Sequence, residues 1–555
     1  MGKNQHKQAF INDVFVVLFM FIIEYIIFHN VIGTNNLLGD TVDGRLIAHI
    51  SEHWYQVFCG NETITEMHGI FYPAENVLAY SDLLLPVGAF SALLRLIGAT
   101  PFSAFKYVMI FFHLLGGIVF YFHVRYQHRI NIIPGLLATM VFTFSGIIFT
   151  QNVQIISVTT LSIGLVFLYN LLNNKKRSYR IINGVLFALF WVLEACNAFY
   201  VAYMFALQLI IFFIVAILVL LIRDRDRLLT YLRRWYEYVI YMVVMGLLLI
   251  PFLKLYMPIF NSGGGRTWEE VFVSPVELLF YNGLNNYALK DPLSDVHTGY
   301  CLTSFPGAFP LLTSILLLLI VCVGIVLAIM KKTATKRLII ILAISTILIL
   351  LFGISFGGNT LWKIIYVIVP GAKAIRATQR WIVVMLVPLS LLIGLSANVT
   401  YVLCEGKKKV AICVAYMLVI LLFSYENIYW PGFTSSWNDD DSKVYEEYVK
   451  TPPDDCRIFY IKNGDAYGGN TYVNNTSFMS RDDKIQMDAM AIATFYHLKT
   501  FNGYSGLKPE NWNIVSDVGA DTDNQAKEWM RINGIEPDNV YAYDMIKNTW
   551  SKVSN

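Results

Sequence analysis

The chain has 555 residues, of which 56% are hydrophobic and only 15% are charged. Soluble domains carry nearer a quarter of charged residues, so this composition excludes an ordinary soluble protein and is typical of the membrane class. A net charge of +3 is too small to indicate a nucleic-acid partner.

A first apolar stretch, from about 9 to 28, follows the polar N-terminal residues MGKNQHKQ. It is long enough to cross a bilayer, and no small-residue cleavage site follows it. We therefore expect a retained first span and not a removed signal peptide. Further apolar runs of spanning length lie near 102–123, 132–150, 155–172, 181–195, 200–222, 236–255, 306–330, 338–353, 381–403 and 410–429.

Basic residues gather between alternate spans. The clusters are Lys3 and Lys7, Arg125 and Arg129, Lys175 to Arg180, Arg223 to Arg234, Lys331 to Arg337, and Lys407 to Lys409. Placing every cluster in the cytoplasm gives about eleven spans in a multi-pass plasma-membrane protein, with the N-terminus cytoplasmic and the C-terminus extracytoplasmic. This threading requires that Leu83–Gly98, which carries Arg95, lies at the interface or re-enters the membrane.

The segments left outside are rich in polar residues. The loop at 30–82 carries a single basic residue, Arg45, against seven acidic ones: Asp40, Asp43, Glu52, Glu62, Glu66, Glu75 and Asp82. After about 430, strand-like CRIFYIK and helix-like DNQAKEWMRING alternate, which is typical of a small α/β domain. We expect an α-helical membrane module at 1–429 and an extracytoplasmic α/β domain at 430–555.

Four segments of the chain carry a family resemblance. In chain order they are Gly39-Asp40-Thr41-Val42-Asp43, GIFYPAENVLAYSDLLLP (69–86), VPGAKAIRATQR (369–380) and FNGYSGLKP (501–509). Together they resemble the bacterial members of the GT-C superfamily of membrane glycosyltransferases. The resemblance implies a GT-C-type helical bundle and a hexosyltransferase that takes its sugar from a polyprenyl-phosphate donor. A single displacement predicts inversion at the anomeric carbon.

The same resemblance implies roles for individual residues. In the superfamily an acidic residue just after the first span acts in catalysis, which points to Asp40 as the catalytic base, with Asp43 as a second catalytic candidate. Substrate binding is expected at Asp82, Lys373, Arg376 and Arg380. The chain departs from the pattern where relatives often have His after the third span, because Gln151-Asn152 stand there, and Thr378 replaces the middle proline of the arginine motif.

Chemistry explains why such residues would be needed. Sugar transfer from a polyprenyl phosphate to a hydroxyl requires a base for the acceptor's proton and positive charge for the departing phosphate. The guanidinium of arginine makes paired hydrogen bonds to phosphate. Arg376 and Arg380 would share one face if their segment were helical. The carboxylates of the first loop would also suit Mg²⁺ or Mn²⁺, but several members of the superfamily work without metal, so no metal ligand is assigned.

Structural alternatives stand beside these roles. Asp40 or Asp43 would also serve as the N-cap of a helix beginning at Gly44, and Asp82 as the cap of the apolar segment after it. Arg376 and Arg380 would also anchor a loop to lipid headgroups.

Further polar and aromatic residues have open roles. Glu24 and Glu194 lie in or near spans, where an ionisable group either faces a lipid-phosphate cavity or makes a structural hydrogen bond. We interpret His29, His53 and His68 as ordinary loop or interface residues. Nothing in the sequence shows whether Trp54, Tyr72 or Tyr80 stacks on sugars.

The resulting hypothesis is a membrane glycosyltransferase acting on the outer face of the membrane. Its partners would be a polyprenyl-phosphate-linked sugar, a glycan or teichoic-acid-type acceptor, and membrane lipid. Two other classes stay open: a transporter or flippase of lipid-linked glycans, which needs a phosphate clamp but no base, and a non-catalytic partner in glycan assembly.

Overall fold

The computed structural model describes residues 3–29, 31–33, 38, 43–150, 152–261, 266–276, 280–281, 309–428, 449–464 and 481–554. Within these ranges eleven helices are long and apolar enough to cross a membrane, which confirms the predicted runs. They are α1 (Lys3–Phe28), α4 (Pro101–Phe122), α5 (Ile132–Phe144), α6 (Asn152–Asn173), α7 (Arg177–Ala195), α8 (Phe199–Arg223), α10 (Trp235–Asn261), α12 (Leu311–Met330), α13 (Lys336–Gly353), α15 (Trp381–Leu403) and α16 (Gly406–Ile428).

The apolar segment with Arg95 does not form a span. It folds as α3 (Leu85–Leu96), a helix of 12 residues. At 1.5 Å per residue this helix is about 18 Å long, which is too short for a hydrocarbon core of about 30 Å. The expectation that this segment does not cross the membrane is therefore borne out by its length.

The chain packs as two units. Unit 1 contains residues 1–27, 110–253 and 260–431, and unit 2 contains 28–109, 254–259 and 432–555. Most of the spans belong to unit 1, whereas the acidic first loop belongs to the same unit as the C-terminal residues. Whether 430–555 is a domain of its own remains a prediction.

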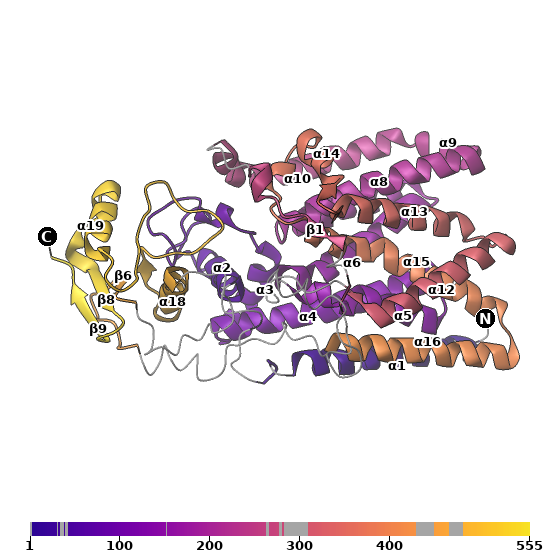
Figure 1. The fold of residues 1–555 in the computed structure, drawn as a ribbon, viewed down its shortest axis with the longest axis horizontal. Coiled ribbons are helices and arrows are strands. Elements are labelled where there is room, and N and C mark those ends of the chain that lie inside the picture. The colour runs from indigo at the N-terminus through magenta and orange to yellow at the C-terminus, as the bar shows by residue number, and fades with distance from the viewer. Residues whose placement is uncertain are drawn as a thin grey trace. The chain divides into compact units, whose positions relative to one another are not determined.

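Unit 1 is built around α15. This helix packs against α5, α8, α12 and α13, several of which run beside it in Figure 1. Small residues allow the helices to approach closely: a Cβ on Gly324 of α12 would lie 2.4 Å from the Cβ of Ser396, and one on Gly394 of α15 would lie 2.8 Å from that of Ala138. Accordingly 89% of an apolar 18-residue stretch of α15 is buried.

Shorter elements complete unit 1. At one end lie α14 (Trp362–Ile368) and a three-stranded sheet of β1 (Ser274–Pro275), β4 (Ile354–Phe356) and β5 (Asn359–Thr360), in which β1 pairs parallel with β4. A parallel pair joins β2 (Phe280–Tyr281) to β3 (Phe309–Pro310). The short helix α9 (Arg225–Leu232) connects α8 to α10. A π-helical turn, His123–Gln127, follows α4, and the 3₁₀ turn Gly146–Thr150 follows α5.

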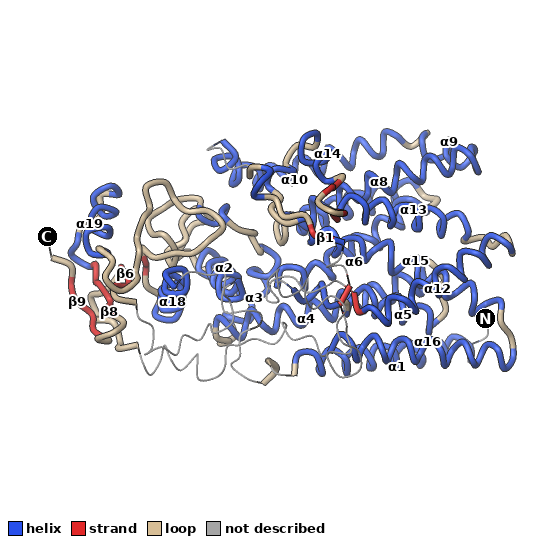
Figure 2. The backbone as a smooth tube through the Cα atoms, in the orientation of Figure 1, coloured by secondary structure: helices blue, strands red, loops and turns tan. Residues whose placement is uncertain are grey.

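Unit 2 contains a four-stranded sheet. Its order is β7 (Lys499–Thr500), β6 (Ile458–Lys462), β8 (Val540–Asp544) and β9 (Thr549–Lys552), with β6 parallel to β7 and β8, and β9 antiparallel to β8. Helix α19 (Thr522–Asn533) packs on β6, as Figure 2 shows beside the red strands, and ends at Gly534 with a φ of 64°. The strand and helix expected in this tail are both present, so its α/β character is confirmed.

Helices α2 (Asp43–Phe58) and α18 (Arg481–Tyr496) complete unit 2. Helix α2 packs on α3 and α18. A buried ion pair between Arg45 and Asp488, at 2.7 Å, joins α2 to α18. The single basic residue of the first loop is therefore used inside unit 2.

Candidate functional site

The arginine motif lies in the connection between α13 and α15, at one end of unit 1. Strand β4 of this connection pairs with β1, and the backbone N–H of Phe272 donates to the carbonyl of Arg376 at 2.7 Å. The N–H of Arg266 donates to the carbonyl of Lys373 at 2.9 Å. The segment at 266–276 thus holds the motif along its length.

Two tyrosines from the first turn of α8 hold the other side of the motif. The Tyr200 hydroxyl donates to the carbonyl of Ala374 at 2.8 Å, and the Tyr203 hydroxyl donates to that of Pro370 at 3.0 Å. Gly371 makes the turn with a φ of 84°, and a Cβ there would lie 3.2 Å from the Tyr203 ring. The loop is therefore fixed to a spanning helix by side chains.

The three predicted cations are presented by this framework. The Arg380 guanidinium lies over the Tyr200 ring, 4.5 Å from its centroid, and the Lys373 ammonium lies 5.9 Å from that of Tyr366. The Arg376 side chain is exposed, while its N–H donates to the Tyr200 hydroxyl at 3.4 Å. Tyr200 therefore contacts both arginines, one through its hydroxyl and the other through its ring.

None of these cations is paired with a carboxylate in the part of the chain that the structure describes. Among those residues, no ion pair within 4.0 Å involves Lys373, Arg376 or Arg380. The Nε of Arg380 is buried and has no hydrogen-bond partner there. A guanidinium that stacks on a ring keeps its N–H edge for an anion, so the arrangement suits phosphate.

The two arginines do not lie on one helix, so the condition for a shared helical face is not met. Arg376 lies in a bend, and only Thr378–Arg380 forms a 3₁₀ turn before α15 begins at Trp381. The Thr378 N–H donates to the carbonyl of Phe272 at 3.0 Å, and its hydroxyl donates to that of Gly353 at 2.9 Å. Because proline has no N–H and no hydroxyl, threonine at this position supplies two bonds that proline would not.

The acidic candidates belong to unit 2. Asp40 lies outside the described residues, and Asp43 is the first residue of α2, with a side chain that is not described. Asp82 is half-buried three residues before α3 and follows Ser81, whose carbonyl accepts a hydrogen bond from Tyr256 at 2.6 Å. The roles of all three stay predictions. Gln151 also lies outside the described residues.

No metal centre is found in the described ranges. Within them no group of three or more His, Cys, Asp or Glu is placed to hold an ion. Because Asp40 is outside those ranges, the expectation of Mg²⁺ or Mn²⁺ at the first loop is untested.

Two of the resembling segments bind each other inside unit 2. The N–H of Phe71 donates to the carbonyl of Asn502 at 2.8 Å, and the N–H of Tyr72 donates to that of Thr500 at 2.8 Å. A Cβ on Gly503 would lie 2.5 Å from the Phe71 ring, so this position requires glycine. The segments at 69–86 and 501–509, more than 400 residues apart, form one packed structure.

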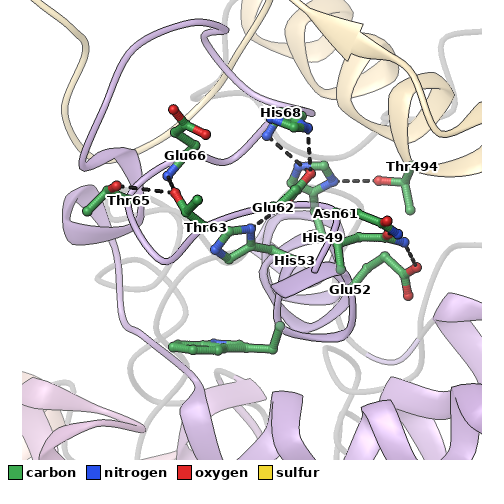
Figure 3. A network of polar contacts seen from close by, with 12 residues as sticks. His49, Glu52, His53, Asn61, Glu62, Thr63, Thr65, Glu66, His68 and Thr494 are labelled. Atoms are coloured by element: carbon green, nitrogen blue, oxygen red, sulfur yellow. Dashed lines mark hydrogen bonds and ion pairs between the residues drawn. The ribbon is translucent and has the colours of Figure 1, made fainter. Parts of the chain in front are cut away.

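Unit 2 also contains a polar network that sequence reasoning missed. Figure 3 shows Glu62 between His53 and His68: its carboxylate pairs with Nδ1 of His53 and lies 3.6 Å from Nδ1 of His68. Nδ1 of His49 lies 2.5 Å from the Thr494 hydroxyl. His49 and His53 are four residues apart on α2, and this spacing on one helical face was a signal in the sequence.

Burial changes the protonation of this network. Removal from water lowers the pKa of His49 to about 4 and also lowers that of His68, against the attraction of Glu62. Burial raises the pKa of Glu52, although Arg95 donates to it at 2.8 Å and 3.1 Å. His53 and His68 are therefore parts of a packed network and not ordinary loop residues.

The aromatic candidates of the first loop differ in exposure. Trp54 is buried, and its indole N–H donates to the carbonyl of Leu83 at 2.6 Å, so it is part of the core. Tyr72 is half-buried beneath the Lys499 ammonium, at 4.5 Å, and Tyr80 packs edge-on against Phe71. A role in stacking on sugars is untested for Tyr72 and Tyr80.

The two acidic residues within spans make hydrogen bonds inside unit 1. Both oxygens of Glu24 in α1 lie within 2.9 Å of Nδ1 of His113 in α4, and Nε2 of His113 lies 2.9 Å from the carbonyl of Thr143. Ser157 donates to Glu194 at 2.5 Å, and Thr160 donates to its other oxygen. Both residues are thus engaged within the bundle.

Comparisons with known proteins place the chain among similar structures. No family model and no curated protein matches it. An oligosaccharyltransferase from Archaeoglobus fulgidus, tethered with an acceptor peptide, is 13% identical, with a TM-score of 0.48 and coverage of 96% of this chain and 68% of that one. AglB from the same organism, in complex with an inhibitory peptide and a dolichol-phosphate, is 12% identical, with a TM-score of 0.49 and coverage of 96% of this chain and 69% of that one.

A bacterial structure is similar to the same degree. ArnT from Cupriavidus metallidurans, bound to undecaprenyl phosphate, is 11% identical, with a TM-score of 0.49 and coverage of 96% of this chain and 90% of that one.

Proposed function

We propose that the chain is a membrane glycosyltransferase that moves a sugar from a polyprenyl-phosphate donor to a hydroxyl of a cell-surface glycan or teichoic-acid-type acceptor. The observation that carries this proposal is the arginine site at the end of unit 1. Arg376 and Arg380 are ordered by Tyr200, and neither is neutralised by a carboxylate among the described residues.

The position of the site suits a lipid-linked phosphate. It lies where α8 begins and where α13 and α15 are joined, so it is at the end of three candidate spans. A polyprenyl chain would lie along the apolar helices while its phosphate reaches the arginines. Guanidinium groups bind phosphate with paired, charge-assisted hydrogen bonds, and the Lys373 ammonium adds a third positive charge.

The reaction would be a single displacement. The acceptor hydroxyl attacks the anomeric carbon, a new carbon–oxygen bond forms, and the bond from that carbon to the phosphate oxygen breaks, with inversion. The proton of the hydroxyl passes to the carboxylate of Asp40, the expected base. The departing polyprenyl phosphate gains negative charge, which Arg376 and Arg380 would stabilise.

The test uses purified full-length chain in vesicles with a polyprenyl-phosphate sugar whose sugar is radiolabelled. We expect label to move to an added acceptor, and the double variant Arg376→Ala/Arg380→Ala to abolish that transfer. Movement of the intact donor across the bilayer without transfer would indicate the flippase class. Donor binding without transfer or translocation, with every candidate sugar and acceptor, would indicate a non-catalytic assembly partner.

A further inference from the structure

A second cationic cluster lies in unit 1, away from the arginine motif. The turn between α6 and α7 forms a shallow open hollow lined by Asn173, Asn174, Lys175, Lys176 and Tyr179. The carboxamide of Asn174 accepts from the N–H of Lys176 at 3.2 Å, and the carboxamide of Asn173 donates to the carbonyl of Tyr169 at 2.9 Å. The hollow is therefore shaped by local hydrogen bonds.

The corner between α9 and α10 adds further positive charge to this turn. The guanidinium of Arg234 donates to the carbonyl of Leu172 at 3.2 Å, at the end of α6. Arg177 lies over the ring of Tyr236, 4.9 Å from its centroid. Arg233 precedes Arg234 and is exposed. The cluster of Lys175, Lys176, Arg177, Arg233 and Arg234 is called the α6–α7 basic cluster below.

The described part of the chain supplies little negative charge to this cluster. Glu237 is buried and is engaged by Arg180 at 2.9 Å and 2.5 Å, and Asp224 pairs with Arg337. Asp226 is exposed in the first turn of α9. Among the described residues, no carboxylate lies within 4.0 Å of any of the five cations.

The surroundings of the cluster are apolar. Tyr179 and Ile182 of α7 are 52% and 55% exposed, and Trp235 and Val239 of α10 are 65% and 50% exposed. Helices α7 and α10 are candidate spans, so these exposed side chains would face lipid when the helices cross a membrane. Tyrosine and tryptophan are typical of the membrane interface, where headgroups meet acyl chains. A ligand at this place would contact basic residues with its head and apolar helices with its tail.

We propose that the α6–α7 basic cluster binds the phosphate of an anionic membrane phospholipid, whose acyl chains cover the exposed side chains of α7 and α10. The lysines and arginines supply charge-assisted hydrogen bonds to the phosphate, and the Asn carboxamides and the Tyr179 hydroxyl supply further polar contacts. This site is distinct from the proposed donor site, because it involves the turn between α6 and α7 and the corner between α9 and α10, and no residue of the arginine motif.

The test measures binding of phosphatidylglycerol to the purified full-length chain in phosphatidylcholine nanodiscs, by native mass spectrometry. Lys175→Gln/Lys176→Gln/Arg177→Gln should lose affinity by about fivefold for each charge removed, on the order of 100-fold in total. Lys407→Gln/Lys408→Gln/Lys409→Gln removes the same charge at another turn and should bind as the wild type does. Unchanged thermal unfolding in pure phosphatidylcholine would show that both variants are folded.

Three results would overturn the proposal. In the first, the cluster variant keeps the wild-type preference for phosphatidylglycerol. In the second, both variants lose affinity equally, which would mean that general positive charge attracts the lipid. In the third, millimolar inorganic phosphate displaces the lipid completely, which would make free phosphate the ligand. Sugar transfer plays no part in the measurement, so failure of the proposed function would not affect its outcome.

Discussion

Among the residues that the structure describes, Arg380 is held by an aromatic ring and not by a carboxylate, and this contact determines what the side chain can do. A guanidinium paired with a buried carboxylate would be neutralised within the protein, whereas one stacked on Tyr200 keeps its charge for an external anion. The same tyrosine fixes the backbone of the loop through its hydroxyl. One residue of α8 therefore orders both halves of the arginine motif.

The first prediction concerns this contact. Arg380→Ala should weaken donor binding by about 1.5–3 kcal/mol, the cost of a lost charge-assisted hydrogen bond. Arg380→Lys should restore little of the lost affinity, because the lysine ammonium is a point charge and lacks the planar guanidinium group that makes paired hydrogen bonds to phosphate. Donor affinity can be measured by titrating a fluorescent polyprenyl phosphate. Lys363→Ala, which removes an exposed cation from the same connection, is the control. Equal losses of donor affinity in the two alanine variants would mean that the donor phosphate is attracted by general positive charge and not bound by Arg380 specifically.

Sequence reasoning found these residues by type but not their arrangement. Arg376, Arg380 and Lys373 could be named from the motif, because cation identity is written in the sequence. The ring beneath Arg380 could not, since Tyr200 lies 180 residues earlier and meets it only through the packing of α8 on α15. The network of His49 and Glu62 was missed for the same reason, because burial and the contact with α18 are tertiary.

At the scale of elements, the hydrogen bonds of His113 determine how α1 is joined to α4. The carbonyl of Thr143 can only accept, so Nε2 of His113 carries a proton. A single further proton then lies between Nδ1 and the Glu24 carboxylate, and the pair is neutral overall wherever that proton resides. A neutral pair is the form that an apolar bundle tolerates.

The second prediction follows from this proton count. Glu24→Gln should be tolerated, because neutral His113 can donate from Nε2 to Thr143 and accept from the glutamine amide at Nδ1. Glu24→Ala leaves Nδ1 of neutral His113 without this partner and should destabilise the chain by about 1–3 kcal/mol, the cost of an unsatisfied buried polar group. Thermal unfolding in detergent compares the two variants. Equal destabilisation by both would mean that the pair needs a full negative charge.

The third prediction concerns α2 and pH. The pKa of His49 is lowered from 6.5 to about 4 in the folded chain, because burial disfavours the charged ring. The unfolded chain therefore binds a proton that the folded chain does not, and the resulting stability is present above pH 6.5 and is lost as the pH falls towards 4. Unfolding curves across this range should show a smaller loss for His49→Gln. An unchanged pH dependence in that variant would assign the effect to other groups, such as His68.

At the scale of the whole molecule, the spans were predictable and their packing was not. Bilayer thickness sets the length and apolarity of a span, so each run could be recognised from local composition alone. The partners of a helix depend on close approaches such as Gly324 against Ser396, which no local pattern reveals. The grouping of residues 28–109 with the C-terminal tail was likewise hidden, because it depends on backbone bonds between Phe71 and Asn502.

The fourth prediction concerns orientation in the membrane. If the basic clusters are cytoplasmic, a cysteine replacing Lys408 should react with an impermeant thiol reagent only after the membrane is opened. A cysteine replacing Asn524, in α19, should react on intact cells. Labelling of both positions from outside would contradict the eleven-span threading and the extracytoplasmic tail.

The fifth prediction tests the central claim, that the chain transfers a sugar with Asp40 as the base and the arginine site as the phosphate clamp. The measurement is turnover and donor affinity, side by side, in Asp40→Asn and Arg380→Ala. Asparagine has nearly the shape of aspartate but cannot take the acceptor's proton. We expect Asp40→Asn to bind donor as the wild type does while turnover falls roughly 10²–10⁴-fold, the range for a lost base.

The same pair of variants separates the two roles, since Arg380→Ala should instead lose donor affinity. Asp43→Asn serves as the neighbouring control and should be milder than Asp40→Asn. Full turnover in both aspartate variants would contradict the enzymatic role of the first loop, even if donor binding still depended on Arg380. Loss of turnover in Asp40→Asn with donor binding intact is the result that the proposed function requires.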